Sequence, residues 1–128
     1  MNKFVGLAIC LGIFVTATHA SDRFSECVAV AKDTNRYLPQ GSKFVNAEVA
    51  ACLPGPNRPI LWYRMRFLPQ GVPVEYEMTD IKKALIESWC TSPGQRALLK
   101  WLDIKYDYFA NNGAFAASIR FGLEDCKN

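Results

Sequence analysis

Histidine is almost absent from this sequence, since His19 is the only one among 128 residues. It falls in an N-terminal segment with the pattern of a cleavable export signal, so we expect the exported chain to contain none. A chain without histidine excludes Ser-His-Asp and Cys-His catalysis and every histidine-ligated metal site. It also lacks the side chain that most often exchanges protons near neutral pH.

The sequence has no hydrophobic run long enough to span a bilayer. Its longest hydrophobic run has the pattern of a signal peptide. Residues 4–15 are apolar and uncharged, follow a short basic start, and are too few to span a bilayer as a stable helix. Thr18 and Ala20 are small residues at the positions that a signal peptidase recognises, which predicts cleavage after Ala20. We therefore expect residues 1–20 to be removed. Residues 21–128 would form an exported protein, periplasmic or secreted, without a transmembrane segment.

Free thiols are expected to be absent from the exported chain. Of five cysteines, Cys10 lies in the signal segment and four remain. Four cysteines in a small exported protein indicate two disulfides, which would leave no thiolate for catalysis or zinc binding. The simplest pairing joins Cys27 to Cys52 and Cys90 to Cys126, tying each helix to its own sheet. Four cysteines allow three connectivities, and the sequence does not choose among them.

Neither charge is in strong excess. Fifteen basic residues, less Lys3 in the signal segment, leave fourteen against twelve acidic residues, a balance of +2. This balance is no signature of nucleic-acid binding. Half of the residues are hydrophobic, which is enough for the core of one small domain.

The hydrophobic pattern predicts an α+β fold in the order helix, hairpin, helix, hairpin. Helical spacing predicts helices over about residues 22–37 and 79–90, and a short third helix that ends near Leu99. Alternating apolar residues predict four strands, at 43–53, 60–68, 102–108 and 115–123. We expect a four-stranded antiparallel sheet with helices packed on one face. The halves 21–68 and 79–126 are candidates for a repeated αββ unit.

The alternation also assigns side chains to the two faces of the expected sheet. Residues of the first strand predicted to share one face are Val45, Ala47, Val49, Ala51 and Leu53. Aromatic residues predicted to lie in the core are Tyr63, Phe67, Tyr106, Tyr108, Phe115 and Phe121. A lipid cavity between the sheet and the helices is an alternative role for these aromatic residues.

The predicted order resembles two groups of exported bacterial modules, the PepSY-type domain and the β-lactamase-inhibitor-protein group. The likeness covers the whole exported chain as architecture, without a shared sequence motif. The second half contains Trp89-Cys90-Thr91-Ser92-Pro93, Tyr106-Asp107-Tyr108, Gly113 and Asp125-Cys126. It is similar there to small exported bacterial proteins of unassigned function. These resemblances imply a periplasmic binding or inhibitory module and transfer no functional residue.

Two groups of residues are candidates for a binding site. Trp62, Arg64 and Arg66 are predicted on the outward face of one strand, where a ring beside two guanidinium groups suits an anionic glycan, a lipid headgroup or an acidic patch. A solvated sheet face is the alternative. Asn57 and Arg58 lie in a loop with three prolines, which lower the entropy cost of presenting them to a partner. An ordinary hairpin loop has the same composition.

Other chemistry has little support. Neighbouring carboxylates, such as Glu75 with Glu77 or Asp103 with Asp107, match solvated strand faces better than the paired carboxyls of a glycosidase. The spacing of oxygen ligands near Asn112 matches no calcium loop. We therefore expect no catalytic residue, metal or cofactor, and no nucleic-acid partner.

The function that these patterns favour is a non-enzymatic exported module that binds another protein in the envelope or outside the cell, as an inhibitor or accessory factor. The main alternative is a binder of an envelope glycan, a lipid or another anionic ligand. A secreted effector is a further alternative.

Overall fold

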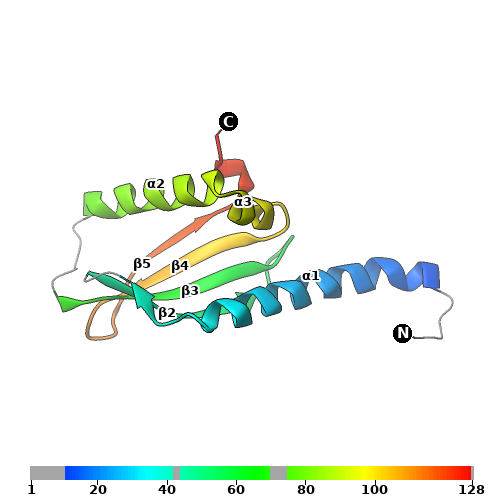
Figure 1. Cartoon of the computed structure of the whole chain (residues 1–128), viewed down its shortest axis with the longest axis horizontal. Coiled ribbons are helices and arrows are strands. Elements are labelled where there is room, and N and C mark those ends of the chain that lie inside the picture. Colours follow the sequence, from blue (N-terminus) through cyan, green and yellow to red (C-terminus); the bar gives the residue numbers. More distant parts are fainter. Residues whose placement is uncertain (1–10, 42–43, 70–74, 128) are drawn as a thin grey trace.

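The structure, a computed structural model, describes residues 11–41, 44–69 and 75–127 and contains one β-sheet with helices packed against it (Figure 1). Its elements are α1 (Leu11–Asn35), β1 (Gln40–Gly41), β2 (Val45–Leu53), β3 (Ile60–Phe67), α2 (Glu75–Thr91), α3 (Pro93–Leu99), β4 (Asp103–Phe109), β5 (Phe115–Phe121) and the short 3-10 helix η3 (Leu123–Asp125). Each predicted helix and strand is present, with shifted ends.

Helix α1 differs most from the prediction, because it begins at Leu11 rather than near residue 22. In the full chain it passes through the expected cleavage point after Ala20. The signal peptide stays a prediction, as does the division of the domain into two αββ halves. Within the described residues, none of the helices combines the length and the hydropathy that crossing a bilayer demands.

The five strands form one mixed sheet in the order β1-β2-β3-β4-β5. Neighbours are antiparallel except β3 and β4, which are parallel. Helices α2 and α3 connect these two strands, and a parallel pair requires such a long crossover. The prediction of four antiparallel strands is therefore wrong. Both hairpins form, but alternation within a strand does not specify which strands of two hairpins become neighbours, or in which direction.

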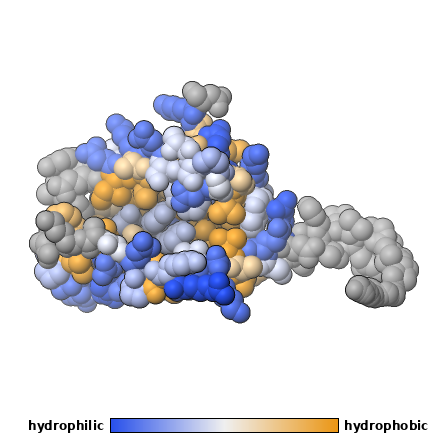
Figure 2. All heavy atoms as spheres, in the orientation of Figure 1, coloured by the Kyte–Doolittle hydropathy of each residue, from blue (hydrophilic) through white to orange (hydrophobic). Residues whose placement is uncertain are grey.

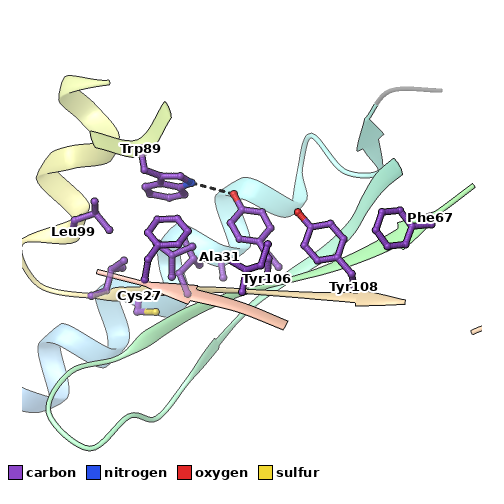
Figure 3. Packing of buried hydrophobic residues seen from close by; sticks show 13 residues of the cluster. Cys27, Ala31, Phe67, Trp89, Leu99, Tyr106 and Tyr108 are labelled. Carbon is purple, nitrogen blue, oxygen red and sulfur yellow. Dashed lines mark hydrogen bonds between the residues drawn. The ribbon is translucent and has the colours of Figure 1, made fainter. Parts of the chain in front are cut away.

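All three helices contribute to a single core on one face of the sheet (Figure 3). Strand residues Leu61, Ile104 and Phe121 follow one another across this face and are buried. Trp89 of α2 packs edge-on against Phe121 and donates a hydrogen bond from Nε1 to the hydroxyl of Tyr106 at 3.0 Å. The indole is thus buried with its one polar atom satisfied, as a core tryptophan requires.

Two disulfides close the domain, with the pairing expected from the sequence. Cys27 of α1 is bonded to Cys52 of β2, with Cα atoms 5.7 Å apart. Cys90 of α2 is bonded to Cys126 beyond η3, with Cα atoms 5.5 Å apart. Each disulfide ties a helix to the sheet region that it covers. Loops of this length contribute about 3 to 4 kcal/mol each in the chain-entropy account of disulfide stability.

Strand β2 contains a bulge that changes the predicted faces. Ala47 pairs with Met65 and Val49 pairs with Arg64, so Glu48 is an extra residue opposite β3. The predicted common face for Val45 through Leu53 is therefore wrong beyond Ala47. Val49 is exposed on the open face, whereas Ala50 is buried against the helices. A bulge of this kind turns two successive side chains to the same side.

A second irregularity lies in β5 and removes one residue from the predicted core. Tyr108 pairs with Ala117 and Phe109 pairs with Phe115, which leaves Ala116 unpaired. Phe115 consequently lies on the open face, where 61% of its surface is exposed and its ring meets Phe109 edge-on. The prediction that Phe115 belongs to the core is wrong for this reason.

Candidate functional site

A groove crosses the helix-covered face of the sheet where α1 and α2 do not meet above it. The cavity has a volume of about 440 Å³. Its floor is formed by Tyr63, Met65 and Tyr106, and Leu85 contributes from α2. In Figure 2, orange and pale surface of apolar and weakly polar residues lies between the bluer outer surfaces of the two helices. The groove is thus an apolar opening in a face that is otherwise covered.

Two tyrosines give the floor its shape and its limited polarity. The rings of Tyr63 and Tyr106 are stacked, with centroids 4.8 Å apart and planes within 8°. Burial raises the pKa of Tyr63, an effect opposed by hydrogen bonding with Thr34. Burial also raises the pKa of Tyr106 far above its ordinary value. Both hydroxyls are therefore neutral at physiological pH and can exchange hydrogen bonds, while Asp33, paired with Arg36, is the charged residue of the lining.

The wall on the α1 side ends in an exposed aromatic residue. Leu38 and Tyr37 follow the last turn of α1 and line the groove, and 68% of the surface of Tyr37 is exposed. A large ring that is solvent-exposed at the edge of an apolar groove is a natural anchor for a partner. The groove can therefore bind an apolar or amphipathic segment.

The predicted trio of Trp62, Arg64 and Arg66 lies on the opposite, open face of the sheet. The structure brings the three residues together and supplies each with a partner. The indole of Trp62 donates a hydrogen bond from Nε1 to Asp107 at 2.8 Å. Arg64 and Arg66 both donate from Nε to the carboxylate of Glu48, at 3.2 and 2.6 Å.

Glu48 is the residue that sequence reasoning missed on this face. The hydrogen bond from Arg66 is the main cause that lowers the pKa of Glu48, and Arg64 adds to it, while burial acts in the opposite direction. Glu48 reaches the two arginines because it lies on the open face of β2 beside the strand β3 that carries them, and the bulge adds Val49 to the same face. An anionic ligand of the trio would have to compete with Glu48, although one carboxylate leaves two guanidinium groups with a net charge of +1. The sequence contains no signal for the bulge.

The loop residues Asn57 and Arg58 lie apart from the trio. Arg58 donates a hydrogen bond to the carbonyl oxygen of Leu99 at 2.9 Å and approaches Asp103 at 3.9 Å, which fastens the loop to the end of α3. Asn57 is exposed beside it. Both residues line a second cavity that includes none of the trio. The two predicted groups therefore belong to different surfaces, and neither includes the groove.

Among the residues that the structure describes, no three His, Cys, Asp or Glu side chains are grouped so as to hold a metal ion. The groove itself could have been found only in part from the sequence. Alternation places Tyr63, Met65 and Tyr106 on one face, but nothing in that pattern tells which part of the face the helices leave uncovered.

Solved structures of other proteins share this α+β arrangement of helices and sheet. The pilotin EpsS of the type II secretion system of Vibrio vulnificus matches with a TM-score of 0.72 and 11% identity, over 88% of this chain and 98% of that chain. The type II secretion system pilotin AspS of Vibrio cholerae matches with a TM-score of 0.66 and 16% identity, over 88% and 99%.

A Pseudomonas aeruginosa protein described as secreted also matches, with a TM-score of 0.69 and 16% identity over 84% and 96% of the two chains. No protein-family model matches the sequence, and no curated protein is similar enough to be matched. The expected resemblance to PepSY-type domains and β-lactamase-inhibitor proteins is wrong, because the structural neighbours are pilotins and a secreted protein. The mixed sheet explains the error, since it arranges the two predicted hairpins in another way. At these identities the likeness shows a shared fold.

Proposed function

We propose that this protein is a small exported accessory protein without enzymatic activity, and that it binds another protein of the cell envelope in a pilotin-like role. The observation that carries the proposal is the apolar groove between α1 and α2. The likeness of the whole fold to two pilotins of type II secretion systems and to a secreted protein supports an exported, accessory role. None of these three neighbours is described as an inhibitor, so an inhibitory role is not proposed.

The groove favours one kind of partner, an amphipathic segment that lays its apolar side on Tyr63, Met65 and Tyr106. Binding of a helix in a groove uses apolar anchors spaced along one side of the helix. The neutral tyrosine hydroxyls tolerate polar atoms at the edge of such a segment. The partner would therefore be a component of a secretion system with an exposed amphipathic helix.

The test compares two exposed aromatic residues on opposite faces of the molecule. The oxidised protein is used to capture its partner from an envelope extract, and the partner is then titrated against purified variants. Tyr37→Asp should weaken its binding at least tenfold, because a charge at the rim opposes burial of an apolar segment. Phe115→Asp is the matched control, since Phe115 is similarly exposed at 61% but lies on the open face.

Equal loss of affinity in both variants would reject the groove as the binding site. The alternative, an anionic glycan or lipid at Trp62, Arg64 and Arg66, is supported by the net positive charge that remains beside Glu48. It predicts the reverse pattern, in which Arg64→Ala abolishes ligand binding and Tyr37→Asp does not. Circular dichroism of each variant checks that the fold is kept.

A further inference from the structure

A second cavity lies beside the middle of α1, and its lining includes three cationic side chains. Its volume is about 650 Å³, and it is enclosed by Arg23 and Phe24 of α1, the loop at residues 54–59, and Lys100 with Trp101 after α3. Eleven residues separate Arg23 from Thr34 of the groove, which corresponds to about 16 Å along a helix. The two cavities share no lining residue.

Three cations and no acidic side chain line this cavity. Arg23 lies over the ring of Trp101, with its guanidinium carbon 5.1 Å from the ring centroid, and forms an ion pair with Glu26 at 3.3 Å. Arg58 donates a hydrogen bond to the carbonyl oxygen of Leu99 and forms an ion pair with Asp103 at 3.9 Å. The side chain of Lys100 is exposed and has no ion pair or hydrogen bond within the described residues. Lys100 is thus the cation most available to a ligand.

The loop that forms one side of the cavity is rigid before any ligand arrives. Pro54, Pro56 and Pro59 restrict its backbone. Gly55 packs so closely that a Cβ atom there would collide with the carbonyl oxygen of Arg58. A loop held in one conformation loses little entropy when a ligand binds.

We infer that this cavity binds a phosphate ester of a polar headgroup, with the anion on Lys100 between Arg23 and Arg58 and the remainder of the headgroup against Trp101 and Phe24. Phosphate offers several acceptor oxygens, and the cavity lining supplies cationic donors from three separate parts of the chain. The exposed ring of Phe24 and the half-buried indole supply the apolar contact. This inference is independent of the proposed function of the groove.

The experiment compares two anionic phosphate esters of glycerol, a soluble monoester and the phosphodiester headgroup of a lipid, against phosphatidylcholine, whose phosphodiester charge is balanced by choline. Glycerol 1-phosphate is titrated while tryptophan fluorescence is recorded, and co-sedimentation is measured with phosphatidylcholine vesicles that contain or lack phosphatidylglycerol. We expect saturable binding to one or both phosphate esters, and at least tenfold weaker binding in Lys100→Glu. Lys82→Glu is the matched control, because it makes the same change of charge at an exposed position on α2. Trp101→Phe should remove the fluorescence response.

A fluorescence response to glycerol 1-phosphate in solution would show that a soluble phosphate ester is sufficient for binding. A response only to vesicles with phosphatidylglycerol would identify a lipid headgroup. Equal weakening in Lys100→Glu and Lys82→Glu would overturn the inference, because it would show attraction to net charge alone. Absence of binding to both probes would overturn it as well.

Discussion

The two faces of the sheet are made by the same strands but are stabilised in different ways. On the covered face, Tyr106 and Tyr108 are buried and stacked beneath the helices. On the open face, Arg64, Arg66 and Glu48 remain roughly one third exposed and interact through ion pairs. Burial of aromatic surface contributes several kcal/mol per residue, whereas exposed ion pairs contribute about 0 to 1 kcal/mol each. The covered face should therefore determine the stability of the fold.

The comparison also bears on function. In the groove the floor residues Tyr63 and Met65 stay partly exposed, and contact of apolar surface with water is unfavourable. The polar network of the open face has no such cost. This difference is why the proposed protein partner is assigned to the groove.

The largest expected effect comes from removing a core side chain of the covered face. Trp89→Ala deletes an indole that is 2% exposed and leaves the hydroxyl of Tyr106 without its donor. We expect a loss of about 3 to 5 kcal/mol in the free energy of unfolding, measured by urea denaturation. Trp62→Ala, on the open face, is the matched control and should cost about 1 to 2 kcal/mol. Similar losses in both variants would contradict the distinction between the faces.

A smaller loss of stability is expected at alkaline pH, and it arises from a tyrosine of the covered face. Burial raises the pKa of Tyr108 to about 12. The stability contributed by this shift is complete below the ordinary tyrosine pKa of about 10 and is lost as pH rises through the pKa in the folded state. Between pH 8 and pH 11 the wild type should lose about 1 kcal/mol more stability than Tyr108→Phe. Parallel pH profiles for the two proteins would show that this hydroxyl is not the cause.

The smallest expected effect is a loss of stability at acid pH, and it arises from a carboxylate of the open face. The pKa of Glu48 is lowered, chiefly by its hydrogen bond with Arg66, so its contribution is complete above its ordinary pKa of 4.5 and is lost as pH falls through the lower pKa in the folded state. Glu48→Gln should cost about 0.5 to 1 kcal/mol at pH 7, after allowance for its exposure. The difference should disappear at pH 3.

The control for this acid effect is Glu87→Gln, because Glu87 is exposed on α2 and has no ion pair among the described residues. Its unfolding free energy should stay within about 0.5 kcal/mol of the wild type at both pH values. A deficit of Glu48→Gln that persists unchanged at pH 3 would mean that the carboxylate charge is not what stabilises the open face.

Much of the architecture could be predicted because it depends on neighbours in sequence. Alternation in β3 assigned Trp62, Arg64 and Arg66 to one face and Tyr63 with Met65 to the other, and this assignment is confirmed by their contacts. The disulfide pairing is also confirmed, since the nearest cysteines along each half lie in a helix and beside the sheet that it covers.

The groove and the partners of the trio could not be predicted. Tyr63 was expected in the core, with a lipid cavity between the sheet and the helices as the alternative, and its pattern resembles that of any buried strand residue. Whether two helices meet above it depends on the packing of α1 and α2, which are far apart in the chain. Val49 was moved to the open face by a bulge that forms only where β2 is paired with β3.

The sequence by itself determined the helices, the two hairpins, the inward face of β3 and β4, and the cysteines that could pair, because each depends on periodicity or on short segments of chain. Only the tertiary structure decided that β3 and β4 are parallel, that a bulge turns Val49 to the open face, and that α1 and α2 leave a groove with a largely apolar floor. These features depend on contacts between residues distant in sequence, and many such arrangements are compatible with one local pattern.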